Sequence, residues 1–256
     1  MSVAPAEAPP RARDARPLLP PSRPPRTRRV DLAVMLFPTA LLAALGWHRR
    51  WMTDDGLIFT RVVRQIAAGH GPVYSVGERV ETSTSTLWPW LLAAAHWVTP
   101  FRDAETGVYL GLALSVGGMW LALDATRRLH RVRTAQRFLL PVGALVFVAI
   151  QVNWDFLTAG MEMGLVLAWI GAAWWLLVAA WRRPAVSRPR LAAAAFLYGL
   201  GPMVRPDLGL TALVLLGTLA WLARARWRAC ALMAAAAGAL PATYQVFRMG
   251  YYGLLV

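Results

Sequence analysis

The stretch "TLWPWLLAAAHWVTP" (Thr86–Pro100) decides how this chain is organised. It is apolar enough to enter a lipid bilayer, but it is shorter than the roughly 20 helical residues that a bilayer core of about 30 Å requires. Pro89, His96 and tryptophans near both ends are typical of a short helix that dips into the membrane interface. Whether this stretch crosses the membrane determines the side on which every later segment lies.

The composition excludes a soluble domain of this size. The chain has 256 residues, of which 57% are hydrophobic and 16% charged, and its mean hydropathy is +0.45. These values predict an all-α polytopic membrane protein. A net charge of +14 would suggest nucleic acid in a soluble protein, but we expect no nucleic-acid partner here. The single cysteine, Cys230, excludes an intrachain disulfide.

The chain divides into a tail and a membrane module. Residues 1–29 are rich in Pro and Arg and predict a disordered, basic cytoplasmic tail without a cleavable signal. Residues 30–256 form the predicted transmembrane module. Its apolar segments cover about 31–47, 86–99, 107–123, 138–154, 161–181, 191–204, 208–223 and 229–247.

Charge decides which of these segments cross the membrane. The basic tail places the amino end inside, and eight crossings would then put Thr126–Arg137, with its five arginines, outside. If Thr86–Pro100 stays on the outer surface, seven crossings remain and residues 48–105 become a long first external loop. This topology places 19 of the 27 arginines inside and nine of the 13 acids outside. We therefore expect a multi-pass protein of the plasma (inner) membrane with a cytoplasmic amino end.

The first external loop contains an acid pair, in "TDDGLIFTRVVRQIAAGHGPVYSVGERVETSTST" (Thr53–Thr86). Asp54 is a suitable cap for a helix over 55–69, and Asp55 favours the positive end of that helix. The apolar stripe of this helix predicts that it lies in the membrane plane. An acid at the mouth of an apolar site can instead act as a general base or a metal ligand. The capping and chemical interpretations both stay open.

Three further polar groups fall on the external face: Asn153–Glu162, Arg205–Asp207 and Phe247–Gly253. Glu162 and Asp207 stand at helix starts, where the helix dipole favours an acid. Arg205, Arg248 and Tyr251 are suitable anchors at headgroup level. The alternative is that acids and arginines converge there on a substrate. No glycine-rich nucleotide loop, Cys/His metal signature or Gly-x-Ser-x-Gly elbow is present.

The external loop strongly resembles that of the GT-C glycosyltransferases, and in particular the AftB-like group of actinobacterial terminal β-(1→2) arabinofuranosyltransferases. The resemblance rests on the acid pair, Gly-His-Gly, Gly-Glu-Arg-Val-Glu and Leu-Trp in the loop, and on "GMEMGL", "RPDLGL" and "RMGYYG" further along. It covers roughly Met52 to the end. Gly56 and Thr82–Ser85 depart from the usual pattern, which leaves the subgroup and the sugar open.

The resemblance implies a GT-C-like module of about seven transmembrane helices, whose first external loop carries one helix along the membrane and another that does not cross it. It also implies a decaprenyl-phosphoryl-arabinofuranose donor and an arabinan acceptor in the cell wall. Relatives of this kind continue beyond the "GYYG" motif, so we expect the module to be truncated at its carboxyl end.

Together these observations predict a glycosyltransferase that moves a sugar, most suitably arabinofuranose, from a polyprenyl phosphate to a glycan on the external face. Asp54 and Asp55 are the candidate catalytic residues. The candidate substrate-binding residues are Arg61, His70, Glu81, Glu162, Arg205, Asp207, Arg248 and Tyr251. Arginine suits the donor phosphate because it forms two parallel hydrogen bonds, and we expect Arg205 to bind it, with Arg61 and Arg248 as the alternatives. We assign no cofactor, and a divalent cation stays open as an alternative without a clear ligand set. The rivals are a polyprenyl-lipid transporter or flippase, and a non-catalytic membrane scaffold.

Overall fold

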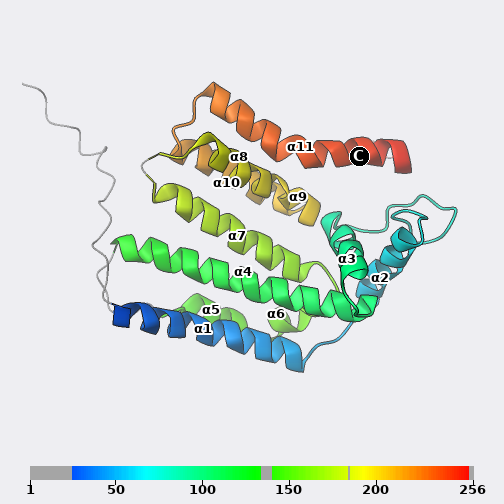
Figure 1. The fold of residues 1–256 in the computed structure, drawn as a ribbon, viewed down its shortest axis with the longest axis horizontal. Coiled ribbons are helices and arrows are strands. Elements are labelled where there is room, and N and C mark those ends of the chain that lie inside the picture. The colour runs from blue at the N-terminus through cyan, green and yellow to red at the C-terminus, as the bar shows by residue number, and fades with distance from the viewer. Residues whose placement is uncertain (1–24, 134–139, 184, 254–256) are drawn as a thin grey trace, which may run out of the picture.

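The computed structural model describes residues 25–133, 140–183 and 185–253 as helices joined by turns and loops, with no strand in those ranges (Figure 1). In chain order the helices are α1 (Pro25–His48), α2 (Asp54–Ala67), α3 (Leu87–Val98), α4 (Asp103–Arg133), α5 (Val142–Ala149), α6 (Gln151–Phe156), α7 (Met163–Trp181), α8 (Arg188–Gly199), α9 (Gly201–Val204), α10 (Leu208–Leu222) and α11 (Trp227–Tyr252). The all-α prediction is confirmed. Of the predicted tail, residues 1–24 lie outside the described residues, whereas 25–29 belong to α1.

Four of these helices are long and apolar enough to cross a membrane: α1 from Val30, α4 as far as His130, α7 and α11. They support a membrane protein. Two of the other predicted crossings are shorter. Helix α10 has 15 residues, and α8 has 12 residues and is followed directly by the short helix α9. At 1.5 Å per residue, α10 is about 22 Å long. The number of seven crossings therefore stays a prediction.

The segment that the sequence predicts as one crossing, 138–154, is divided at Ile150 into α5 and α6. The backbone of Ile150 is extended, so carbonyl groups at the end of α5 lose their helical partners. Two side chains of α6 replace them. Asn153 Nδ2 donates to the Phe147 carbonyl at 2.8 Å, and Trp154 Nε1 donates to the Val148 carbonyl at 3.0 Å.

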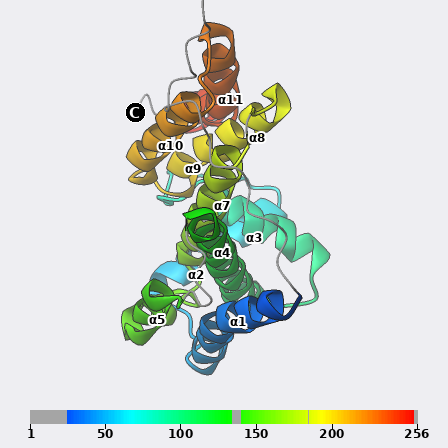
Figure 2. The same cartoon turned by 90° about the vertical axis from the view of Figure 1, so that its left-hand side faces the viewer.

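The helices form a row from α1 and α5, through α4 and α7, to α8, α10 and α11 (Figures 1 and 2). The most extensive contact joins α4 to α7. It depends on small residues, since a Cβ at Gly118 would meet the Leu167 carbonyl, and a Cβ at Gly171 would meet the Gly118 carbonyl. Small residues that let two backbones approach closely are the usual means of packing helices in lipid.

We expect Gly118→Leu to destabilise the protein, on the scale of the roughly 1–3 kcal/mol or more that overpacking costs, because α4 and α7 must separate to admit the side chain. The measurement is the midpoint of thermal unfolding in detergent. Gly117→Leu is the matched control, since nothing lies within 4 Å of a Cβ built there. Equal loss in the two variants would contradict the packing interpretation.

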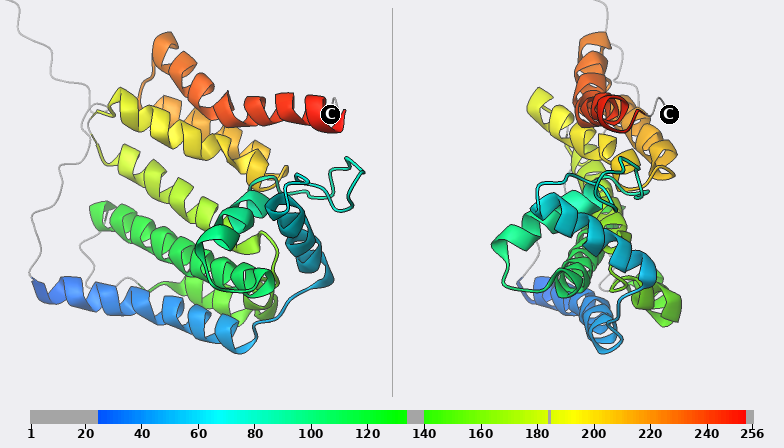
Figure 3. Two further views of the ribbon diagram at one scale, coloured as in Figure 1. Left: turned by 45° about the vertical axis from the view of Figure 1, so that its right-hand side comes forward. Right: turned by 90° about the vertical axis from the view of Figure 1, so that its right-hand side faces the viewer.

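At one end of the row, α2 and α3 lie across the ends of the long helices, close to the last turns of α11 (Figure 3). This "α2 end" also contains the starts of α4, α7 and α10. The opposite end contains the starts of α8 and α11 and the end of α10 (Figure 1). All the predicted site residues lie on segments that meet at the α2 end.

Candidate active site at the α2 end

A buried turn, residues 157–162, holds the start of α2 and the start of α3 in place. Thr53 donates from its backbone N–H and from Oγ1 to the Ala159 carbonyl, at 3.0 and 2.9 Å. Trp88, fully buried on α3, donates from Nε1 to the Gly160 carbonyl at 2.8 Å. Gly160 has a φ of +81°, which favours glycine. The turn thus fixes α2 and α3 against α7.

Thr53, and not Asp54, caps α2. The Gly56 backbone N–H donates to Thr53 Oγ1 at 2.9 Å, and Thr53 has the extended backbone of a cap residue. The capping interpretation of Asp54 is therefore wrong. Asp54 and Asp55 both lie in the first turn and are exposed, where the helix dipole favours their charge. Across the described ranges, neither carboxylate has a hydrogen bond or an ion pair with another residue. Both are available to a ligand.

The buried turn ends at Glu162, whose side chain is 1% exposed. Its Oε1 accepts from Arg205 Nη1 at 3.0 Å, while its Oε2 has no hydrogen-bond partner within the described part of the chain. Arg205 also donates from Nε to Asp207 Oδ1 at 3.0 Å. That bond raises the pKa of Arg205 and lowers the pKa of Asp207, which keeps both charged. Arg205 is thus shared between two carboxylates, one of them buried.

A second group of predicted residues joins the loop between α2 and α3 to the end of α11. Glu81 Oε2 accepts from Arg248 Nε at 2.8 Å, and Glu81 Oε1 accepts from Tyr244 at 2.9 Å. Tyr251 donates to the His70 carbonyl at 3.2 Å, and Tyr252 donates to the Pro72 carbonyl at 2.7 Å. The last turns of α11 therefore bind both ends of the loop segment 70–81.

Arg61 and His70 meet through Gln65, a buried residue of α2. The Gln65 side-chain amide lies 2.9 Å from His70 Nδ1. In the orientation in which the Gln65 amide nitrogen donates to His70 Nδ1, the Gln65 amide oxygen accepts from Arg61 Nε at 3.2 Å. Arg61 also donates to the Tyr74 carbonyl. Unlike Arg205 and Arg248, Arg61 has no carboxylate partner in the described ranges, so its positive charge is the least neutralised of the three.

Beside these residues lies an open cleft of about 510 Å³. It is lined by Gly69, His70, Gly71, Val73, Val76, Gly77, Glu78, Arg79 and Tyr251. The guanidinium of Arg79 lies 4.9 Å from the centre of the Tyr251 ring. Sequence reasoning did not single out Arg79 or Tyr244, and it placed Tyr252 only in an aromatic belt at the membrane interface. For Arg79, its place within Gly-Glu-Arg-Val-Glu was the available signal.

The structure thus brings the predicted substrate-binding residues together in two groups. In the first group, Arg205 contacts both Glu162 and Asp207. The second group lies at the loop segment 70–81: His70 and Glu81 are its two ends, and Arg61, Arg248 and Tyr251 lie beside it. The two groups are linked at the start of α3, where the Thr86 backbone N–H donates to the Met203 carbonyl at 3.0 Å. Among the described residues, no three His, Cys, Asp or Glu side chains gather as metal ligands.

We expect Glu81→Gln to loosen the loop segment 70–81, because it removes the charge that Arg248 and Tyr244 bind. Hydrogen bonds to a charged group contribute about 1.5–3 kcal/mol, so amide exchange in the segment should accelerate roughly tenfold or more. Hydrogen–deuterium exchange measures this. Glu78→Gln is the matched control, because Glu78 is an exposed acid of the same loop and has no ion pair within the described ranges. If both variants exchange as the parent does, Glu81 does not hold the loop.

Two curated proteins are similar to the chain over most of its length. The terminal beta-(1->2)-arabinofuranosyltransferase of Mycobacterium tuberculosis is 44% identical over 236 residues, which are 89% of this chain and 37% of that protein. The protein of the same name from Corynebacterium glutamicum is 39% identical over 248 residues, 87% of this chain and 35% of that protein. The chain thus spans little more than a third of these relatives. No family model and no solved structure matches it.

Proposed function

Since the chain is a homologue of terminal β-(1→2)-arabinofuranosyltransferases, as its external loop led us to expect, we propose that it transfers arabinofuranose to a glycan acceptor. The donor in this proposal is a polyprenyl phosphate, of the decaprenyl-phosphoryl-arabinose type. The α2 end faces the outside of the cell, and the acceptor is the arabinan of the cell wall.

The main support for the proposal is that Asp54 and Asp55 are exposed and have no partner within the described residues. Thr53 supplies the cap of α2, so the two carboxylates are not needed to complete the helix. They are exposed beside the buried turn at Ala159, at the end of the molecule where the charged residues gather. One of them, as general base, takes the proton from the acceptor hydroxyl as that oxygen bonds to the sugar.

The polyprenyl phosphate leaves as an anion and requires a cation. Arg205 already neutralises buried Glu162, and Arg248 already binds Glu81. Arg61 has only uncharged partners among the described residues, so we assign the phosphate first to Arg61. Arg205 and Arg248 then hold the walls of the site. A divalent cation is an optional addition to this scheme, because the reaction as written does not depend on one.

Transfer of radiolabelled arabinose from a purified lipid donor to a synthetic arabinan tests the proposal. We expect labelled arabinan and free polyprenyl phosphate in equal amounts. Movement of the lipid donor between bilayer leaflets without transfer would favour a transporter instead. Neither activity, with the donor still bound, would favour a scaffold.

The external position of the α2 end is tested by labelling cysteines with an impermeant thiol reagent in intact cells. Cys230 is exposed near the start of α11, at the opposite end, and Arg102 is exposed at the start of α4. We expect no labelling of the parent protein and clear labelling of the Arg102→Cys variant. Labelling at Cys230 but not at position 102 would reverse the orientation and remove the proposed external site.

A further inference from the structure

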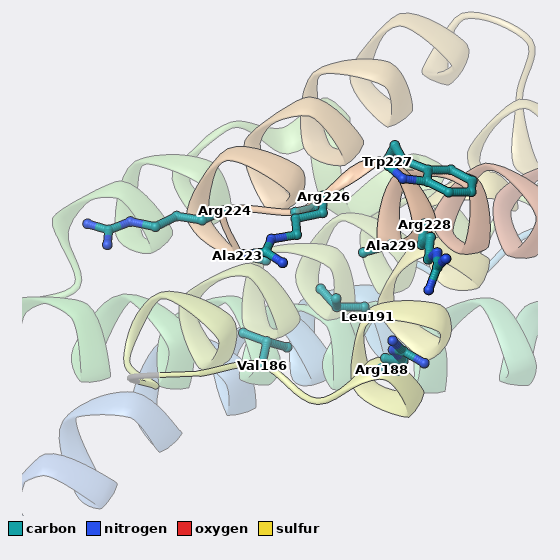
Figure 4. A pocket seen from close by; sticks show the side chains of 10 residues that line it. Val186, Arg188, Leu191, Ala223, Arg224, Arg226, Trp227, Arg228 and Ala229 are labelled. Carbon is teal, nitrogen blue, oxygen red and sulfur yellow. The ribbon is translucent and has the colours of Figure 1, made fainter.

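The opposite end of the helices contains a second cleft, of about 470 Å³, which the proposed transfer reaction does not use (Figure 4). The start of α8, the end of α10 and the start of α11 form it. Its lining residues are Val186, Arg188, Leu191, Ala223, Arg224, Ala225, Arg226, Trp227, Arg228 and Ala229.

The charge of this cleft is wholly positive. Four of its ten lining residues are arginines and none is an acid. The sequence itself contains no Asp or Glu over 163–206 or 208–256, so α7 to α11 contribute no acid to neutralise them. Figure 4 shows Arg188 and Arg228 pointing toward the same region. Arg226 lies on the segment that connects α10 to α11, and Arg224 is directed away from the other three arginines. Like charges that line one cleft repel one another, and a bound anion would relieve that repulsion.

The backbone adds to the positive potential. Both α8 and α11 begin at this cleft, and neither helix has a side-chain cap. Uncapped N–H groups at two neighbouring helix starts point partial positive charge toward the same space. Arginine side chains together with helix starts are a suitable arrangement for a phosphate, which accepts parallel hydrogen bonds.

The surroundings of the cleft indicate a lipid as the source of that phosphate. Trp227 is 74% exposed and Trp221 is 77% exposed, which is the position of tryptophan at a membrane interface. From there α10 presents large exposed apolar side chains, including Leu210 and Leu213, along its length. A lipid headgroup at the arginines would therefore have its acyl chains against an apolar helix surface.

We propose that the cleft formed by Arg188, Arg226 and Arg228 binds the phosphate of an anionic phospholipid. The alternative is that these arginines act only through their number, as determinants of membrane orientation. The two explanations differ in one respect. A binding site depends on where the arginines stand, whereas a charge count does not.

The experiment measures phospholipid binding to the purified protein in mixed micelles by native mass spectrometry, with phosphatidylglycerol and phosphatidylcholine as probes. The variant Arg188→Gln/Arg228→Gln removes two cleft arginines. Arg102→Gln/Arg190→Gln is the control of equal net charge, because both residues are exposed and neither lines the cleft. An arginine near an anionic membrane surface contributes about fivefold in affinity, so we expect about thirtyfold weaker phosphatidylglycerol binding in the cleft variant.

Support requires three results together: preference of the parent for phosphatidylglycerol over phosphatidylcholine, loss of that preference in the cleft variant, and its retention in the control. Equal loss in both double variants would overturn the proposal in favour of a charge count. Displacement of the lipid by equimolar glycerol 3-phosphate or inorganic phosphate would overturn it in favour of a soluble anion. The four substituted residues are exposed, and size-exclusion profiles verify that each variant is folded.

Discussion

Replacing Asp54 with Asn is expected to slow sugar transfer by roughly 10²- to 10⁴-fold, the usual contribution of a general base. Asn has nearly the size of Asp but cannot take the proton of the acceptor hydroxyl. Loss of a helix cap does not explain such an effect, because Thr53 Oγ1 accepts the capping hydrogen bond from Gly56. Removing a charge from the first turn of α2 costs only about 0.3–1 kcal/mol of stability.

Asp55→Asn is the partner test, since adjacent residues of a helix point about 100° apart and only one is expected to reach the acceptor. The measurement is the initial rate of labelled arabinose transfer, together with donor binding, which either variant should retain. Thr53→Ala is the structural control: it should cost about 1 kcal/mol for the lost cap and about 1 kcal/mol for the lost bond to the Ala159 carbonyl, while the folded fraction still transfers sugar. Parental rates in both Asn variants would contradict the catalytic assignment and favour the transporter or the scaffold.

Local sequence patterns predicted α2 and α3 well. The structure has a helix at Asp54–Ala67, where the apolar stripe predicted one over 55–69, and another at Leu87–Val98, where 86–99 was predicted. The prediction of α2 depended on features within one or two turns, namely the acid pair at its start and the glycines after its last turn. The choice between Thr53 and Asp54 as cap was beyond these rules, because either residue type is a good cap. Only the bond to Gly56 distinguishes them.

Contacts between distant residues were beyond the sequence patterns. Glu162 and Arg205 are separated by 43 positions, and Glu81 and Arg248 by 167, so no periodicity relates the partners. Charge and hydropathy placed all four residues at one surface. The sequence explained each of them separately, through a helix dipole or an anchor at the headgroups, and did not pair them. The division at Ile150 was missed for a similar reason. An apolar run looks the same whether or not Asn153 replaces the lost helical bonds.

The Arg205→Met variant is expected to lose about 3 kcal/mol of stability, because the buried Glu162 side chain would lose its ion-pair partner. Removing one partner of a buried ion pair costs about 3–5 kcal/mol, and the lower value applies because one third of the Arg205 side chain is exposed. Asp207→Asn is the matched control. Its side chain is 66% exposed, so losing its bond to Arg205 should cost less than about 1 kcal/mol.

The double variant Arg205→Met/Glu162→Gln separates a structural role from donor binding. Gln is neutral, so it no longer requires the guanidinium, and we expect thermal stability to recover by most of the loss of the single variant. If Arg205 serves only to hold Glu162, donor binding recovers with stability. If Arg205 also contacts the donor phosphate, binding stays weakened by roughly tenfold or more in a stable protein. A double variant no more stable than Arg205→Met would contradict the buried pair as the source of the destabilisation, because charge neutralisation at Glu162 removes that cost by itself.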